Sequence, residues 1–171
     1  MSRGYFVFAQ GKEYIRMAYA LALSIKNTQE INSVCVAIDE KDTVPTEYAK
    51  VFDHVVRVRN VGLKDPMANE WQIWDLTPYK ETIHVEADML FTTNIDWWWQ
   101  DLQKHEIFFT SKVYDYRGHV AQSNFYRKHF DKMNLPKLYN GLYYFRYTDT
   151  AHKFFKKAKE VSARYKHYAE Y

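Results

Sequence analysis

Two acidic residues separated by one alanine, Glu86 and Asp88 in the segment TIHVEADML, are the strongest candidates for chemistry in this sequence. Successive side chains of a β-strand point to opposite faces, so a strand through this segment predicts both carboxylates on one face. Two such carboxylates repel each other, and a divalent cation removes the conflict. Oxygen ligands favour Mg²⁺ or Mn²⁺, which commonly bind through one or two carboxylates and phosphate oxygens. The pair suggests a metal-diphosphate site, and a solvated strand end is the alternative.

His84 precedes the acid pair and would lie on the same face of the strand. It could extend the pair to a line of three metal ligands. A histidine in the middle of a parallel strand is more often a hydrogen-bonded core residue, and this is the interpretation that we favour.

The acid pair is surrounded by short apolar runs that are typical of strands. Three of them precede it, at Gly4 to Ala9, Val34 to Asp39 and His54 to Val58, and two more strands are expected at Ile107 to Val113 and Leu142 to Tyr147.

Helical patterns separate these runs. After the first strand, apolar residues recur at helical spacing, namely Tyr14, Met17, Ala18, Leu21 and Ile25. Short helices are expected at Glu47 to Val51 and in WQIWDL, after a loop from Val61 to Asn69. A last amphipathic helix is expected to be capped within Thr148 to Thr150, with an apolar stripe of Phe154, Ala158, Val161, Tyr165 and Tyr168. The alternation predicts an α/β fold with a mostly parallel sheet flanked by helices.

Composition limits the classes of function. The 171 residues suffice for one core, so we expect a single domain over residues 1–171. A net charge of +3 is too small to predict nucleic-acid binding. Cys35 is the only cysteine, which excludes an internal disulfide and a cysteine-based zinc site. Because the sequence shows neither a signal peptide nor a transmembrane segment, we expect a soluble, cytoplasmic protein.

Several segments follow the order found in glycogenin-like glycosyltransferases of family eight, and the chain resembles that family. The segments are FVFAQGKEYIRMAYALALSIK, VFDHVVRV, WDLTPYKETIHVEADMLFTTNID and YNGLYYFR. They span roughly Gly4 to Lys157, and Trp74 to Asp96 is the most specific part. The resemblance implies a GT-A fold, a nucleotide-sugar donor that is usually UDP-linked, a Mn²⁺ cofactor, and transfer to an unknown acceptor with retention.

The resemblance also implies roles for individual residues around the nucleoside. The loop after the first strand and the head of the next helix would line the nucleoside site, through Ala9, Gln10, Gly11 and Tyr14. The Tyr14 ring would lie against the base, because ligands of open parallel sheets bind beyond the carboxyl ends of the strands. The alternative is that Tyr14 begins the apolar stripe of the helix.

At the other end of the donor, the resemblance makes Glu86 and Asp88 the metal ligands, with Ala87 between them in the same binding site. The amide of Asn140 would contact the donor sugar, and Gly141 would permit close approach of the backbone, although an Asn-Gly pair alone is a turn signal. Asp115, just past the strand expected at Ile107 to Val113, is near the place where the family often has a donor-binding aspartate. The catalytic set that we expect is therefore Asp88, Asn140 and Asp115.

The sequence departs from the family pattern in three places. Glu86 stands where the family usually has Asp, and Glu70 falls where a lysine is common. Family members also continue beyond the position of Tyr171, into an Asp-Gln pair and a histidine that supplies a third metal ligand. We therefore expect the C-terminal part of the family fold to be missing, so that the chain is a fragment, is completed by another element, or is catalytically weak.

Three consecutive tryptophans, Trp97, Trp98 and Trp99, follow the NID turn. Because consecutive helical residues are about 100° apart, they cannot easily all face one core. We predict that at least one is exposed and serves an acceptor, a partner chain such as a second copy, or a membrane edge. The basic face of the last helix could also touch anionic lipid, although such faces are usually only solvated.

Two other functions remain open from sequence alone. One is a non-catalytic module that binds a sugar nucleotide or a partner without turnover. The other is a nucleotidyltransferase on the same sheet, for which the loop AQGKEY has fewer glycines than expected.

Overall fold

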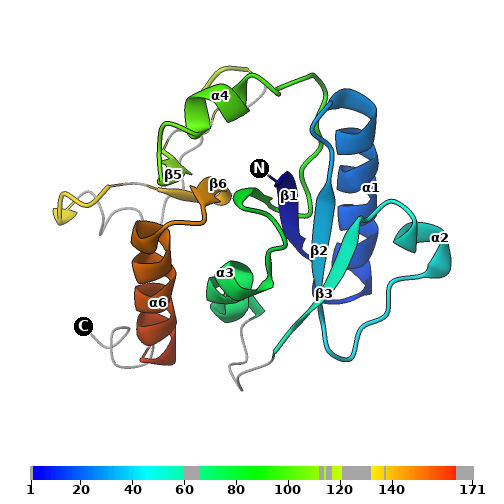
Figure 1. Cartoon of the computed structure of the whole chain (residues 1–171), viewed down its shortest axis with the longest axis horizontal. Helices are drawn as coiled ribbons and strands as arrows, with labels where there is room; N and C mark the ends of the chain where they lie inside the picture. The colour runs from blue at the N-terminus through cyan, green and yellow to red at the C-terminus, as the bar shows by residue number, and fades with distance from the viewer. Residues whose placement is uncertain are drawn as a thin grey trace.

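The computed structural model describes residues 2–59, 66–111, 114, 117–120, 132–136 and 138–164. Within these residues, six strands form one sheet in the order β3-β2-β1-β4-β6-β5 (Figure 1). The strands are β1 (Arg3–Phe8), β2 (Val34–Asp39), β3 (His54–Val58), β4 (Glu81–Val85), β5 (Ile107–Thr110) and β6 (Tyr139–Arg146). The helices are α1 (Lys12–Thr28), α2 (Thr46–Ala49), the 3₁₀ helix η1 (Pro66–Gln72), α3 (Ile73–Leu76), α4 (Trp98–Leu102) and α6 (Asp149–Ala163).

The sheet is parallel from β3 to β4 and changes direction at β6. β1 pairs in parallel with both β2 and β4, whereas β6 pairs antiparallel with both β4 and β5. The carboxyl ends of β1, β2, β4 and β5 and the start of β6 therefore share one edge, which we call the C-terminal edge. The opposite side, where β1 and β4 begin and β6 ends, is the N-terminal edge. The predicted α/β fold with a mostly parallel sheet is confirmed.

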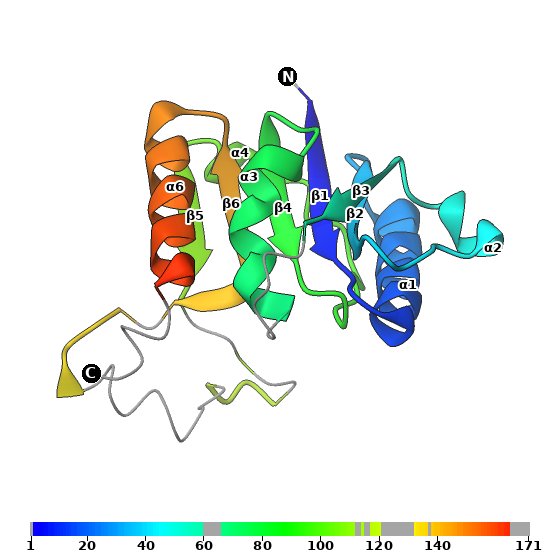
Figure 2. The ribbon, with the colours of Figure 1, turned by 90° about the horizontal axis from the view of Figure 1, so that it is seen from below.

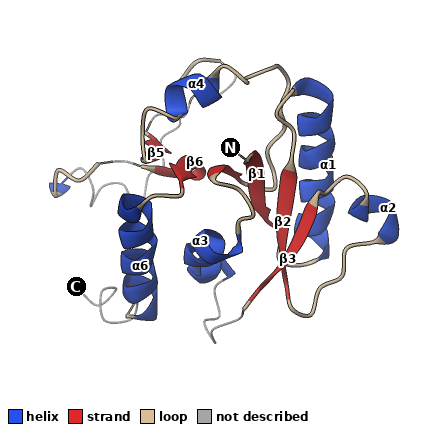
Figure 3. Ribbon diagram, viewed as in Figure 1, coloured by secondary structure: helices blue, strands red, loops and turns tan. Residues whose placement is uncertain are grey.

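Helices cover both faces of this sheet (Figure 3). One core lies under α1 and α4, where Tyr5 and Val7 of β1 meet Ile83 and Val85 of β4. The other core lies under α3 and α6 and contains the alternate residues of the strands, including Phe6. Because both faces are covered, every residue of β4 is buried, as expected for a central strand between two helical layers.

The buried face of α1 differs from the predicted stripe at two positions. Its buried residues are Ile15, Ala18, Leu21, Ala22 and Ile25. Tyr14 and Met17 are 56% and 39% exposed, so their assignment to the apolar stripe is wrong. The helix begins at Lys12, and from there the side that faces the sheet passes through Ile15 rather than Tyr14. The Tyr14 ring is thus accessible from solvent.

The last helix begins as predicted but packs through another face. The Thr148 hydroxyl accepts a hydrogen bond from the Ala151 amide at 3.4 Å, which confirms the predicted cap. Ala151 and Phe155 are the buried residues, whereas Phe154 and Val161 are exposed, so the predicted stripe is wrong in its described part. Phe155 is buried because it packs against Phe145 and other rings on the sheet. Tyr165 and Tyr168 lie outside the described residues.

Among the described residues, the structure has no helix of the length and apolarity needed to cross a bilayer.

His84 is a core residue, as predicted, but its predicted hydrogen bonds are missing. The side chain is 1% exposed and lies between the rings of Phe8 and Tyr143. Neither ring nitrogen makes a hydrogen bond of good geometry. Burial lowers the pKa of His84 to about 3. The nearby Phe6 backbone favours the protonated form and raises the pKa, but this effect is smaller than that of burial. The fold therefore holds a neutral imidazole, which does not act as a third ligand for the acid pair.

Titration of His84 should make the protein less stable in mild acid. The unfolded chain binds a proton at this residue below about pH 6.5, and the folded chain does so only near pH 3, so stability falls as the pH drops between these values. We expect a loss of about 1.4 kcal/mol per pH unit from this group. Urea unfolding at pH 7 and pH 5 should show a shallower pH dependence for His84→Leu than for the wild type, with the exposed His105→Leu as the control. An unchanged slope in His84→Leu would contradict the buried neutral imidazole.

Candidate functional site

The segments that carry the candidate residues of the sequence lie at the C-terminal edge. The loop after β1, the turn after β4 and the start of β6 all lie there, because β6 runs antiparallel to β4. In Figure 2 the arrowheads of β1, β4 and β5 point to this common side. Ligands of open α/β sheets bind beyond the carboxyl ends of the strands, so this edge is the place to expect a site.

Glu86 is fixed to the start of β6 by its main chain and by its side chain. Its backbone amide donates a hydrogen bond to the Gly141 carbonyl at 3.0 Å. The Tyr139 hydroxyl donates to Glu86 Oε2 at 3.1 Å. The carboxylate is half-buried, and within the described residues Oε2 is the only one of its oxygens that accepts a hydrogen bond. A pre-positioned carboxylate of this kind suits cation binding.

Asp88 follows in a turn rather than in the strand. β4 ends at Val85, and the Met89 amide donates to the Glu86 carbonyl at 3.2 Å to close the turn. The strand predicted through Asp88 is therefore too long. Alternate burial nevertheless continues through the turn, because Ala87 lies in the core while Glu86 is half-buried and Asp88 is exposed. Both acids are therefore at least partly accessible from solvent, whereas Ala87 is buried and its side chain cannot contact a ligand.

Gly141 is required by the close approach of two side chains. A Cβ atom at this position would lie 2.4 Å from Glu86 Oε2 and 2.5 Å from the Tyr139 hydroxyl. The Asn-Gly pair lies inside β6, which begins at Tyr139, so the strand predicted from Leu142 starts too late and the turn alternative does not apply. The pairing of β5 and β6 shifts register between Phe109 and Thr110, opposite this pair. Such bulges often re-aim residues next to active sites.

Asn140 is oriented by an acid from η1. Its side-chain amide donates to Glu70 Oε2 at 2.5 Å. The acid that stands at the expected lysine position thus holds the asparagine and is not an isolated negative charge. Burial, and then the Glu70 carboxylate, raise the pKa of the neighbouring Tyr143 hydroxyl well above its usual value. Asn140 is left with an oriented amide oxygen at the C-terminal edge.

The expected nucleoside loop lies at the same edge, after β1. Gly11 has φ of 97°, a conformation that favours glycine, and precedes the first residue of α1. Its amide donates to Asp42 Oδ2 at 2.6 Å. Ala9 is fully buried, so its methyl group cannot line a binding site, and Gln10 is half-buried. The exposed Tyr14 ring is the best-placed member of the set for contact with a base.

Of two other expected groups, one lies outside the described residues and the other lies away from this site. Asp115 lies outside the described residues. Trp97 is 59% exposed and Trp99 is 1% exposed, which confirms that at least one of the three tryptophans is exposed. The Asp96 carboxylate binds the Glu30 and Ile31 amides, which precede β2, so Trp97 lies near the N-terminal edge. Strands of this length separate the two edges by about 20 Å, so Trp97 cannot contact a sugar held at the C-terminal edge.

The carboxylates of Glu86 and Asp88 fit a hard divalent cation only in part. No group of three or more His, Cys, Asp or Glu side chains suited to a metal occurs within the described part of the chain. Mg²⁺ and Mn²⁺ accept one or two protein carboxylates when phosphate oxygens and water complete the shell. The residues therefore fit a metal that arrives with a diphosphate better than a metal held by the protein alone.

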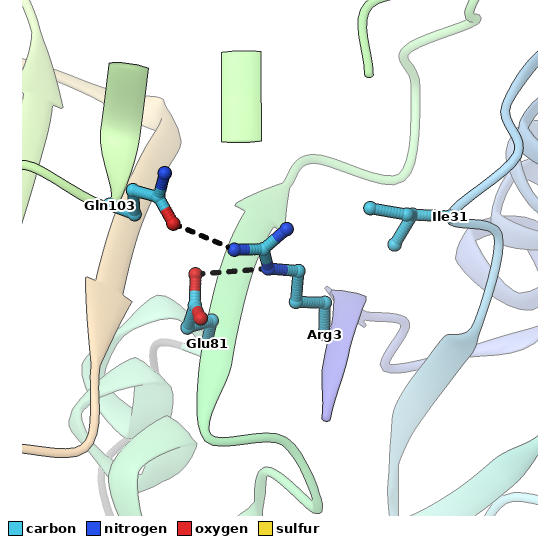
Figure 4. A pocket seen from close by; sticks show the side chains of 4 residues that line it. All are labelled: Arg3, Ile31, Glu81 and Gln103. Carbon is cyan, nitrogen blue, oxygen red and sulfur yellow. Dashed lines mark hydrogen bonds and ion pairs between the residues drawn. The ribbon is translucent and has the colours of Figure 1, made fainter. Parts of the chain in front are cut away.

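A cavity of about 560 Å³ lies at the opposite, N-terminal edge, lined by Arg3, Ile31, Glu81 and Gln103 (Figure 4). Arg3 donates to Glu81 Oε2 at 3.2 Å and to Gln103 Oε1 at 2.9 Å. The Tyr144 hydroxyl also donates to Glu81, at 3.2 Å. Arg3 and Glu81 thus form an ion pair with each other in the wall of the cavity. Because this cavity lies at the opposite edge from Glu86 and Asp88, we do not assign it as the candidate site.

Sequence reasoning missed the residues that support the site, namely Tyr139, Asp42 and the contact of Glu70 with Asn140. Tyr139 precedes the Asn-Gly pair directly, and an aromatic hydroxyl beside it is a signal that could have been weighed. Asp42 contacts Gly11, and Glu70 contacts Asn140, from distant segments of the chain. No local sequence pattern indicates these contacts.

Comparisons with known proteins support the fold. No family model matches the sequence, and no curated protein matches it significantly. The glycosyltransferase GlyE of Streptococcus pneumoniae TIGR4 superposes with a TM-score of 0.63 and 10% identity, over 100% of this chain and 40% of GlyE. The bifunctional glycosyltransferase WbbM gives 0.60 and 12%, over 95% of this chain and 34% of WbbM. Core-mannan synthase A of Aspergillus fumigatus, in its Mn/GDP form, gives 0.58 and 7%, over 95% and 65%.

The chain thus spans between a third and two fifths of the length of GlyE and WbbM. At these identities the likeness shows the GT-A-like fold alone. Membership of the glycogenin-like family stays a prediction.

Replacement of Gly141 by alanine tests the geometry around Glu86. The added methyl group would meet Glu86 Oε2 and the Tyr139 ring, so Gly141→Ala should lower the free energy of unfolding by about 1–3 kcal/mol. In Glu86→Ala one of the two obstacles is gone, and the same glycine substitution should cost less. Urea unfolding of both single variants and the double variant measures the coupling. Strictly additive losses would show that the two residues do not meet.

Proposed function

We propose that this chain is the donor-binding part of a metal-dependent glycosyltransferase, which moves a sugar from a UDP-linked donor to an acceptor. The observation that carries the proposal is that Glu86, Asp88, Asn140 and the start of α1, which carries Tyr14, all follow or begin strands at the C-terminal edge of a GT-A-like sheet. The glycosyltransferases GlyE, WbbM and core-mannan synthase A share this fold, which supports glycosyl transfer as the class of reaction. Transfer with retention of configuration is carried over from the family resemblance.

In this proposal Glu86 and Asp88 hold Mn²⁺ or Mg²⁺ together with the donor diphosphate. The bound cation would neutralise the charge that develops on the departing diphosphate. Tyr139 holds the Glu86 carboxylate in place because its hydroxyl donates a hydrogen bond to Oε2. Because Glu86 is one methylene longer than the usual aspartate, this second contact restricts a side chain that would otherwise have more freedom.

Asn140 would orient the sugar. Its amide nitrogen is engaged by Glu70, so the amide oxygen is directed to accept a hydrogen bond from a sugar hydroxyl. The absence of a side chain at Gly141 leaves this strand close to Glu86, so the sugar and the metal-bound phosphate would lie side by side.

The nucleoside would lie against Tyr14, on the first turn of α1. A helix N-terminus usually attracts phosphate. Here the Asp42 carboxylate already accepts the Gly11 amide, which makes this helix end unfavourable for a second anion. The diphosphate is therefore directed away from α1 and toward the acid pair, and the uncharged base remains near Tyr14.

A non-catalytic sugar-nucleotide-binding module is the second candidate. It is favoured by the lack of a three-ligand group among the described residues. The module would bind the donor and release no product.

Release of nucleoside diphosphate separates these functions. We expect a panel of UDP-sugars with Mn²⁺ to yield UDP, slowly by hydrolysis and faster with an acceptor. Asp88→Asn should reduce the rate by at least about 100-fold, because a transition-state contact is lost, whereas the surface control Asp101→Asn should not. Donor binding without UDP release would favour the module, and release that is equal in Asp88→Asn would contradict the assigned site.

A further inference from the structure

Three charged side chains form a row across three neighbouring strands at the N-terminal edge. Arg3 of β1 is paired with Glu81 of β4, and Glu81 is paired in turn with Arg146 of β6. Because residues paired across strands share one face of a sheet, all three lie on the same face. The Tyr144 hydroxyl donates to Glu81 from the core under α1 and α4, which identifies that face. The row contains two cations and one anion.

Arg146 is the cation of this row whose charge is less well balanced. It forms no ion pair with a described acid, and its buried Nε atom makes no hydrogen bond with a described residue. Glu81 Oε2 is already shared by two other donors. The carboxylate of the neighbouring Glu106 accepts from the Thr150 and Thr148 hydroxyls, which lower its pKa. The row therefore keeps part of its positive charge uncompensated.

The cavity of about 560 Å³ at this edge is lined by two members of the row, Arg3 and Glu81, and by Ile31 and Gln103 (Figure 4). Arg3 donates through Nε to Glu81 and through Nη2 to Gln103, so Nη1 makes no hydrogen bond with a described residue. Gln103 accepts through Oε1, which leaves its amide nitrogen as a donor. In Figure 4 both of these nitrogen atoms point away from Glu81. The wall of the cavity thus offers donors from two adjacent planar groups.

Such donors, next to a partly uncompensated cation, suit an oxyanion, because guanidinium groups bind carboxylates and phosphates through directed hydrogen bonds. The acids at this edge favour the carboxylate. Glu81 lines the same cavity, and Glu30 is exposed next to Ile31. A phosphate dianion would be repelled by both acids, whereas a carboxylate carries a single charge and is repelled less.

We propose that this cavity is a second ligand site, which binds the carboxylate group of a small organic acid between Arg3 and Gln103. Glu81 would hold the arginine through Nε and leave Nη1 for the ligand. Arg146 would contribute its charge from the other side of Glu81 without touching the ligand. Ile31 would contact the apolar part of the acid. The volume lies within the range of small-molecule sites, which is about 300–1,000 Å³.

This inference goes beyond the proposed transferase activity. None of the residues that line the cavity belongs to the donor site, which lies at the opposite edge of the sheet. Binding of an organic acid requires neither a metal nor a nucleotide sugar. The test is therefore made in EDTA, where Glu86 and Asp88 hold no cation that could attract an anion. Failure of one proposal leaves the other standing.

Thermal unfolding of the full chain, followed by tryptophan fluorescence, tests the cavity. A ligand that binds only the folded protein raises the unfolding temperature further as its concentration exceeds the dissociation constant. At constant ionic strength we expect this effect from at least one of acetate, lactate and benzoate. Acetamide, lactamide and benzamide have the same shapes without the charge and should not bind. Inorganic phosphate should bind at least about tenfold more weakly than the best carboxylate.

Two variants and two matched controls locate the contact. Gln103→Glu replaces the amide donor by a negative charge and should weaken carboxylate binding by at least about tenfold. The new carboxylate can pair with Arg3, so this variant keeps the fold. Arg3→Gln should abolish binding, and it also lowers stability because the buried Glu81 loses its ion pair. Ala20→Glu on α1 and Lys153→Gln on α6 make the same charge changes at exposed positions, and both should bind as the wild type does.

Loss of carboxylate binding in Gln103→Glu, with binding kept in Ala20→Glu, would support the site. The proposal is overturned if none of the three carboxylates stabilises the wild type, or if the neutral amides or phosphate bind as well as the carboxylates do. It is also overturned if Gln103→Glu binds as tightly as the wild type, or if a control variant loses as much affinity as Gln103→Glu.

Discussion

The hydrogen bond between the Glu86 amide and the Gly141 carbonyl is the constraint on which the rest of the site depends. It continues the pairing of β4 and β6 one residue beyond the end of β4. Because nothing larger than glycine fits at position 141, the Glu86 carboxylate and the Tyr139 hydroxyl meet directly over the strand. The same approach brings Asn140 to the edge of the sheet. This one backbone hydrogen bond between β6 and the residue after β4 thus positions the Glu86 carboxylate, the Tyr139 hydroxyl and the Asn140 amide.

The direction of β6 gives the two edges of the sheet different properties. A β6 strand parallel to β4 would begin at the N-terminal edge and place Asn140 far from Glu86. As the sheet is built, the N-terminal edge holds the paired charges of Arg3 and Glu81 and the exposed Trp97. The C-terminal edge holds the partly exposed carboxylates Glu86 and Asp88 and the Tyr14 ring. Paired charges stabilise the fold, whereas accessible oxygen atoms are available to a ligand.

The sequence was sufficient to predict the α/β class, the first three strands and the neighbourhood of the acid pair, because apolar periodicity reports burial directly. It was insufficient where contacts between distant segments decide which side chains are buried and where a strand begins. Phe155 rather than Phe154 is buried because of rings on the sheet, and Asn140 lies in a strand because β4 pairs with it. The contact of Asp42 with Gly11 joins residues 31 positions apart. No local spacing encodes such a contact.

Titration calorimetry of UDP in the presence of Mn²⁺ tests most directly whether the C-terminal edge binds the donor. Removal of a ring that stacks on a base typically weakens binding by about 1–3 kcal/mol, which is roughly 5- to 150-fold. The account predicts such a loss for Tyr14→Ala, and none for Tyr147→Ala, a comparably exposed ring that follows β6 at the opposite edge. Omission of Mn²⁺ should weaken binding in all three proteins. Equal affinity in Tyr14→Ala and the wild type, or no binding by the wild type, would contradict a donor site at this edge.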